Sequence, residues 1–229
     1  MNLTNTTLMF EQPVWVAVSL AILFFLLVLF AWRPGLRLMN HFRLQYLIKR
    51  LGQAVIKNIY LSDNVGEPIY IEQLVLTPEG LIVVMVKPFR GAIFAAEHIE
   101  QWTQVIRHHS YKFPNPLHQL ESDVQGLKSI FPKTVISGMV LFAKGGQFPK
   151  GKPSNVIAYP ELKLMTALPN TDSVPTELEN TWQTITQQAQ PATHTHESTL
   201  YRRGDKPRFI FAVIGLMGLL AYAIAYWML

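Results

Sequence analysis

The sequence predicts a mixed α/β domain carried between two membrane-spanning helices. Two long apolar segments lie near the ends of the chain, and between them the elements follow the order helix, three strands, helix, strand. Of the 229 residues, 49% are hydrophobic and only 15% are charged, which excludes a disordered tail and is too apolar for an ordinary soluble domain. The absence of cysteine excludes disulfide scaffolds, thiolate metal sites and thiol catalysis.

Each apolar segment is long enough to cross a bilayer. Residues 14–32 contain Ser19 as their one non-hydrophobic residue, and residues 209–229 are interrupted only by Gly215 and Gly218. At about 1.5 Å per residue, either helix spans a hydrocarbon core of roughly 30 Å. No Lys or Arg precedes residue 33, whereas a cleaved signal peptide begins with a basic region, so we expect a retained anchor.

The positive charge gathers beside these two segments. Residues 33–50 and 201–208 together carry nine bases and one acid, whereas residues 51–200 carry 11 bases and 13 acids. Because basic flanks stay on the cytoplasmic side, we expect the middle of the chain in the cytoplasm and both termini outside. The expected location is a plasma membrane, of the bacterial inner-membrane kind. The net charge of +5 then reports membrane orientation and not nucleic-acid binding.

The same patterns divide the chain into consecutive parts. Pro34-Gly35 is expected to interrupt the first helix, and a new apolar helical face then follows through Met39, Phe42 and Tyr46. The expected parts are an external tail (1–13), a first transmembrane helix (14–32), a basic juxtamembrane helix (33–50), a cytoplasmic domain (51–168), a linker with a short amphipathic helix (169–208) and a second transmembrane helix (209–229).

Within the cytoplasmic part, strand and helix signals alternate. The best hairpin signal is a pair of aliphatic runs, 70–76 and 81–87, joined through Thr77-Pro78-Glu79-Gly80. The clearest helix is amphipathic and covers residues 116–131. Further strands are predicted at 58–61, 92–94, 134–142 and 155–159, and a further helix at 175–190.

The residues from Ile71 to Lys87, followed by Gly91, Trp102, Asn115-Pro116 and Gln119, resemble the NERD (nuclease-related) domain. That family shows an Asp before a hydrophobic strand, a Pro-x-Gly turn, Glu-x-Lys on the next strand, and Asn-Pro-x-x-Gln opening a helix. The resemblance covers about residues 50–145. It implies a distant relation to PD-(D/E)XK nucleases and a restriction-endonuclease-like αβββαβ core, in agreement with the order of elements above.

Placed on the family pattern, the remnants of a catalytic site are Glu72, Lys87 and Gln119. Glu72 stands where the family has Asp, and Met85 replaces the Glu of Glu-x-Lys. Gln53 stands where the first helix usually carries an acid. The resemblance therefore implies a nuclease fold in which two of the expected acidic positions are neutral.

Strand geometry groups these residues independently of the resemblance. A two-residue loop at 78–79 puts Glu72 opposite Met85 and Tyr70 opposite Lys87, with all four side chains on one face. Mg²⁺ requires oxygen ligands, and the Met85 thioether is too soft to supply one. We expect no cofactor, and Mg²⁺ only if Glu72 and Lys87 retain weak activity. A structural alternative is a Glu72–Lys87 ion pair, worth roughly 0–1 kcal/mol near a surface.

The sequence therefore predicts a membrane-anchored pseudonuclease that acts as a binding or scaffold module at the cytoplasmic face, such as an accessory subunit of a membrane complex. Its expected partners are the lipid bilayer and a membrane protein or a second copy of the chain, and no small-molecule substrate is evident. The alternative is a membrane-tethered nucleic-acid-binding protein or a weak metal-dependent nuclease. For nucleic-acid contact the candidates are Lys144, Lys150 and Lys152, although the domain's net negative charge disfavours that partner.

Overall fold

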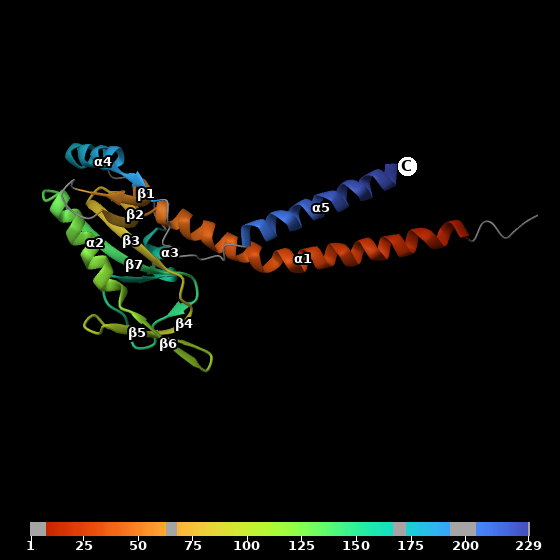
Figure 1. Ribbon diagram of the computed structural model, residues 1–229, viewed down its shortest axis with the longest axis horizontal. Helices are drawn as coiled ribbons and strands as arrows, with labels where there is room; N and C mark the ends of the chain where they lie inside the picture. The colour runs from red at the N-terminus through yellow and green to blue at the C-terminus, as the bar shows by residue number, and fades with distance from the viewer. Residues whose placement is uncertain (1–7, 63–67, 167–172, 193–204, 229) are drawn as a thin grey trace, which may run out of the picture. The chain divides into compact units, whose positions relative to one another are not determined.

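The computed structural model describes residues 8–62, 68–166, 173–192 and 205–228 (Figure 1). The chain forms two compact units, one of Met1–His41 with Leu200–Leu229 and the other of Phe42–Thr199. Half of the predicted tail and much of the predicted linker lie outside the described residues.

The N-terminal helix α1 (Leu8–Lys49) continues through Pro34 and Gly35, so the break predicted there is wrong. A single proline removes one intrahelical hydrogen bond, and the long helical segments on both sides keep the helix intact. Gly35 also meets a close neighbour, because a Cβ at this position would stand 3.1 Å from the Phe209 ring. The predicted parts 14–32 and 33–50 are therefore one continuous helix.

Helix α5 (Asp205–Met228) packs on α1 within the first unit through small residues. Ala212 is buried, and a Cβ at Gly215 would stand 3.2 Å from Leu27. Among the described residues, one helical stretch, Val18–Lys49, is long and apolar enough to cross a membrane. The second membrane crossing stays a prediction.

The second unit is built on a six-stranded mixed sheet in the order β10-β1-β2-β3-β7-β9. Strands β1, β2 and β3 are antiparallel, and β7 and β9 continue the sheet in parallel with β3. The predicted mixed α/β class is confirmed, and the predicted order appears as α1, β1 to β3, α2 and β7. The strands are β1 (Ala54–Leu61), β2 (Ile69–Thr77), β3 (Gly80–Lys87), β7 (Ile136–Phe142), β9 (Val156–Ala158) and β10 (Gln190–Pro191).

Helix α2 (Pro116–Ile130) covers one face of this sheet and lies across β2, β3 and β7 (Figure 1). It approaches β7 most closely at Gly138, where a Cβ would stand 2.8 Å from Leu120 and 2.9 Å from Val124. Gly138 pairs with Val83, so the odd-numbered residues of β3 point toward α2. Gly138 thus sets how closely α2 approaches the sheet beside β3.

A second, four-stranded sheet has the order β6-β5-β4-β8. Trp102 joins it to the core, since its fully buried ring stacks on Phe142 at 6.2 Å between centroids. The hairpin of β5 and β6 was not predicted, because Gln and Thr interrupt the apolar residues of β5 and most residues of β6 are polar or Pro. The strands are β4 (Gly91–Phe94), β5 (Gln101–Ile106), β6 (His109–Pro114) and β8 (Gly146–Gln147).

Two further helices complete the second unit, α3 (Tyr159–Met165) and α4 (Thr176–Gln188). Helix α4 confirms the helix predicted at 175–190. The helix predicted through Met39, Phe42 and Tyr46 is present as the last part of α1, and these three side chains are exposed. The buried residues of this part of α1 are Leu38, Leu44, Leu47 and Ile48, and the chain changes to strand β1 soon after the helix ends.

We expect Gly138→Ala to lower the free energy of unfolding by about 1–3 kcal/mol, because the added methyl overpacks the contact with Leu120 and Val124. The measurement is urea unfolding of the full chain in mild detergent, followed by tryptophan fluorescence. Ser137→Ala, at the exposed neighbouring position, is the matched control and should change little. Equal stability of the two variants would contradict the close approach of α2 to β7.

Candidate functional site

The candidate site lies where β2 separates from β3. The β2–β3 pairing runs from Thr77–Gly80 to Gln73–Val84, which confirms the register expected from a two-residue loop. Beyond Val84, β3 remains paired with β7 as far as Lys87, but β2 no longer pairs with it. The last residues of β3 therefore lose their backbone partner on the β2 side.

The Glu72 carboxylate replaces that missing partner. In a continued ladder the Val86 amide would face Ile71, since paired residue numbers add up to 157 in this register. Instead, the Val86 N–H donates to Oε2 of Glu72 at 3.0 Å. A buried backbone N–H without an acceptor costs about 1–3 kcal/mol, so this contact stabilises the separated strands. Glu72 therefore has a structural function at the point of separation.

The separation changes which β2 side chains point toward α2. Ile69 packs toward α2, because a Cβ at Gly126 would stand 2.5 Å from the Ile69 Cδ1 atom. Neighbours along a strand point to opposite faces, so Tyr70 lies on the face away from α2. Its hydroxyl donates to Asn58 Oδ1 at 3.0 Å, and Asn58 has a φ of 50°. The expected cluster of Tyr70 with Lys87 on one face is therefore wrong.

Helix α2 contributes an acid that sequence reasoning missed. Asp123 is buried, and its Oδ1 accepts a hydrogen bond from Nε2 of Gln119 at 2.7 Å. Burial raises the pKa of Asp123 to about 6, and the Gln119 hydrogen bond and the positive charge of Lys87 oppose this shift. Of the predicted residues, Gln119 thus binds this acid on its own helix, and the charge of Lys87 acts on it from β3.

Asp123 was overlooked because it lies between the apolar positions Leu120 and Val124 of an amphipathic helix, next to Glu121 and Ser122, and looks like a solvent-facing residue. A signal was present, since Asp123 lies four residues after Gln119 and side chains at that spacing meet on a helix.

Gln53 lies apart from these residues. It precedes β1, outside any helix, and its backbone N–H donates to the Leu76 carbonyl at 2.8 Å. Leu76 is four residues along β2 from Glu72, which corresponds to about 13 Å of strand. The neighbouring Gly52 permits this contact, because a Cβ there would stand 2.1 Å from the Leu76 oxygen.

The remaining motif residues hold the second sheet and α2 in place. The buried Asn115 side chain accepts from the Leu117 N–H at 3.0 Å and thereby caps α2, with Pro116 at the first turn. Its amide group also donates to two carbonyls of the preceding loop, those of Glu97 and Ile99. The Trp102 indole donates to the Ala96 carbonyl at 2.9 Å in the same loop.

The comparisons with known proteins agree with this architecture. Residues 35–143 match the profile of the NERD family, the nuclease-related domain. The chain carries a nuclease-related domain. An uncharacterized protein of Bacillus anthracis is 28% identical over 74 residues, which is 32% of this chain and 35% of that protein. The similarity thus spans about a third of the relative's length. No solved structure matches the chain.

The nuclease-related fold implies Mg²⁺, so the oxygen donors near the end of β3 decide whether the ion fits. Glu72 already accepts the Val86 amide, Asp123 accepts Gln119, and the buried Met85 offers only sulfur. Mg²⁺ prefers a nearly octahedral set of oxygen ligands. Within the described ranges, three or more His, Cys, Asp or Glu side chains do not come together to hold a metal. The donor set of this nuclease-related domain therefore does not fit a Mg²⁺ site.

The three lysines predicted for nucleic-acid contact have different surroundings. Lys152 forms an ion pair with Glu161 at 3.0 Å and also donates to the Val156 carbonyl. Lys150 lies over the Phe94 ring, with its ammonium 5.8 Å from the ring centroid. Lys144 is exposed. Because one of the three charges is neutralised within the domain, they form a weaker cationic patch than the sequence suggested.

We expect Asp123→Asn to stabilise the protein at neutral pH. The folded pKa of Asp123, about 6, lies above its ordinary value of 3.8, so the charged form costs stability above pH 6. The shift of about two pKa units corresponds to at most about 3 kcal/mol. As the pH falls from 6 to below 4, wild type should regain this stability and the difference between the two proteins should vanish.

The measurement is urea unfolding of both proteins at pH 7.5 and pH 4. Glu121→Gln, which changes an exposed acid of the same helix, is the control. Destabilisation by Asp123→Asn at pH 7.5 would show that ionised Asp123 instead stabilises the fold through Lys87.

Proposed function

We propose that the chain is a membrane-anchored relative of nucleases that binds a partner at the cytoplasmic face without cleaving nucleic acid. Metal-dependent phosphodiester cleavage needs oxygen ligands for the metal and a cation near the phosphate. Lys87 supplies a cation. The proposal depends most on Met85. Its buried thioether occupies the position at which the family has a carboxylate.

The two acids near Lys87 support the same conclusion. The Glu72 carboxylate satisfies the Val86 amide, and Asp123 is buried in α2 with Gln119 as its donor. Drawing Glu72 toward a metal would leave the buried Val86 amide unsatisfied, which costs about 1–3 kcal/mol. The residues that remain from a nuclease site are therefore better suited to holding β2, β3 and α2 together.

The proposed membrane anchor rests on α1 and α5 and on the charge beside them. Helix α1 contains a stretch long and apolar enough to cross a membrane, and α5 has 24 residues. Nine bases flank the two apolar segments on the side of the middle domain, as expected for cytoplasmic loops. From this arrangement we infer two membrane passes and a scaffold role, for example as an accessory subunit of a membrane complex.

The experiment that tests the missing catalysis uses the full chain purified in mild detergent. Labelled DNA and RNA, single- and double-stranded, are incubated with Mg²⁺ or Mn²⁺. We expect wild type to cleave no faster than Glu72→Gln and Lys87→Ala, because none of the three assembles a metal site. Metal-dependent cleavage that both substitutions abolish would refute the proposal.

A gain of metal binding provides the reciprocal test. Met85→Glu places a carboxylate on the face of β3 that points toward α2, and we expect measurable Mn²⁺ affinity by calorimetry. Met139→Glu is the matched control, since Met139 is also buried but belongs to the opposite face of the sheet. A folded Met85→Glu protein that binds no more Mn²⁺ than Met139→Glu would contradict the placement of position 85.

The proposed topology predicts opposite results for two alkaline phosphatase fusions. The enzyme is active only outside the cytoplasm, so a fusion after Leu229 should be active and a fusion after Pro169 inactive. Both activities are normalised to the amount of fusion protein. Activity at Pro169 with none at Leu229 would reverse the orientation, and equal activity at both positions would eliminate the second membrane pass.

A further inference from the structure

Strand β6 is an exposed edge of the four-stranded sheet. Its order is β6-β5-β4-β8, so in the part of the chain that the structure describes β6 pairs with a strand on one side only. The residues from His109 to Lys112 are all exposed. An exposed strand edge offers N–H and C=O groups with which a further strand can pair. The edge of β6 is therefore a place where another chain can add to the sheet.

The register of the hairpin determines which backbone groups point toward this edge. Ile106 and His109 pair across a two-residue turn. The His109 N–H closes such a turn by donating to the Ile106 carbonyl, and hydrogen-bonded pairs then alternate with non-hydrogen-bonded pairs along the antiparallel ladder. Ser110 and Lys112 occupy non-hydrogen-bonded pairs with β5. Their N–H and C=O groups therefore point away from β5, toward the free edge.

The two faces of β6 differ in chemistry at this edge. Neighbours along a strand point to opposite faces, so Lys112 and Tyr111 lie on opposite sides of the sheet. The Lys112 side chain is exposed. Tyr111 is 52% exposed, and its ring lies 6.4 Å from the ring of His109 on the same face. A strand added beside β6 therefore meets a cation on one face and exposed rings on the other.

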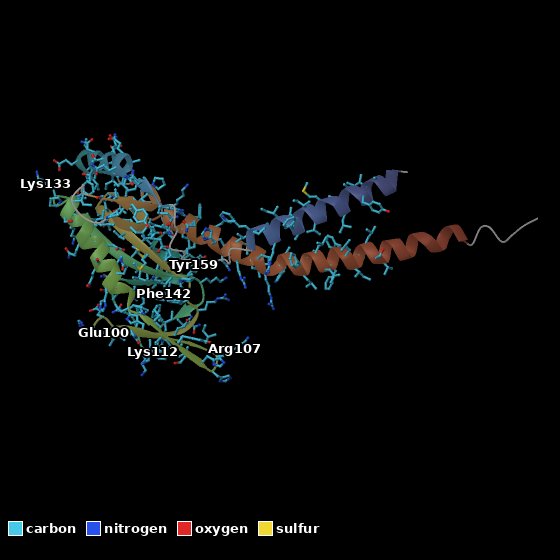
Figure 2. The ribbon with its side chains drawn as sticks, viewed as in Figure 1. Glu100, Arg107, Lys112, Lys133, Phe142 and Tyr159 are labelled. Carbon is cyan, nitrogen blue, oxygen red and sulfur yellow. The ribbon has the colours of Figure 1, made fainter. Side chains whose placement is uncertain are left out.

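The hairpin is basic, although the domain as a whole is not. Residues 101–120 contain two bases, three histidines and no acid, whereas the rest of residues 51–200 contains nine bases and 13 acids. Figure 2 shows the two bases, Arg107 and Lys112, on this hairpin. A second copy of β6 would bring the same cations to the edge, and Pro114 has no N–H to extend the pairing. Charge complementarity thus favours an acidic partner over self-association.

We propose that β6 binds an extended acidic segment of another protein, which adds to the sheet as a further antiparallel strand. Carboxylates at alternate positions of this segment lie beside Lys112, and the apolar residues between them cover Tyr111. Backbone hydrogen bonds supply the affinity in this mode of recognition, and alternate side chains supply the specificity. The inference rests on the proposed function, in which the domain binds without cleaving, and it names the class of partner.

The backbone groups at the edge favour a peptide over other anionic partners. Ser110 and Lys112 each direct one donor and one acceptor outward, and an added strand pairs with both. The phosphate oxygens of a nucleic acid or a lipid headgroup accept hydrogen bonds only, so they leave the two carbonyls unpaired. Opposite Tyr111 the added residue forms a non-hydrogen-bonded pair, in which side chains approach most closely. An added strand therefore uses more of this edge than a phosphate group does.

The test is fluorescence anisotropy of a short labelled peptide of alternating glutamate and valine, with the full chain in mild detergent. With the glutamates opposite Ser110 and Lys112, the glutamate amides face β6 and the valine amides face away. N-methylation of the glutamate amides should weaken binding roughly 2- to 12-fold for each hydrogen bond lost. N-methylation of the valine amides is the matched control and should change little.

Two positions in the protein test the same contacts. Ser110→Pro removes an N–H that points outward, which an edge strand tolerates, and should weaken binding as the methylated glutamates do. Ser110→Thr keeps the N–H and should bind like wild type. Lys112→Glu should prefer a peptide in which lysine replaces glutamate, whereas wild type prefers the glutamate peptide. This exchange of preference tests the site even where Ser110→Pro disturbs the hairpin.

Several results would overturn the proposal. They are no saturable binding of the glutamate peptide by wild type, equal loss of affinity in the two methylated peptides, and the same charge preference in wild type and Lys112→Glu. Tighter binding of single-stranded oligothymidine or of phosphatidylglycerol micelles than of the peptide would assign the hairpin to phosphate groups and would also overturn it.

The outcomes separate this proposal from the proposed function. Metal-dependent cleavage of nucleic acid by a protein that still binds the glutamate peptide, and loses it on Ser110→Pro, would refute the non-catalytic role and leave the β6 site standing. No cleavage together with no peptide binding would refute the β6 site alone.

Discussion

The hydrogen bond from the Val86 amide to the Glu72 carboxylate is the contact on which the arrangement of the site depends. It lets β2 leave β3 without an unsatisfied backbone donor at the separation. Beyond this point Asn58 of β1 adopts a left-handed conformation, and Ile69 of β2 packs toward α2. Strand β3 stays paired with β7 and brings Lys87 toward Asp123. The carboxylate that a nuclease would give to a metal is thus engaged in holding two strands apart.

The rest of the motif supports the same packing. Asn115 caps α2 and ties down the preceding loop, and Trp102 stacks on Phe142. Gly138, which is outside the motif, admits α2 close to β7. Each of these residues has a packing or hydrogen-bonding reason for its position. Asp123 is the exception, since a buried acid with a raised pKa is costly and is countered only by Gln119 and the charge of Lys87. Packing and hydrogen bonding therefore account for the positions of these residues.

Sequence patterns predicted the parts of the molecule that depend on neighbours along the chain. The loop 78–79 specified the β2–β3 register, because a two-residue hairpin leaves one pairing scheme. The spacing of apolar residues placed α2 and α4 within a residue or two. The same reasoning failed at Pro34, where long helical flanks outweigh one missing hydrogen bond. It also missed β5 and β6, which contain many polar residues and are held by Trp102 and by the pairing of β5 with β4.

The sequence by itself determined the mixed α/β class, the thioether at position 85 and the charge beside the apolar segments, because these follow from composition, spacing and local turn chemistry. Its resemblance to a known motif indicated the nuclease-related family. Only the tertiary structure decided which side chains meet. Gln53 lies at the far end of β2 from Glu72, Tyr70 points away from α2, and the charge of Lys87 on β3 acts on Asp123 of α2. The reason is physical: the separation of two strands and the approach of a helix are settled by non-local packing and by the need to satisfy buried backbone groups.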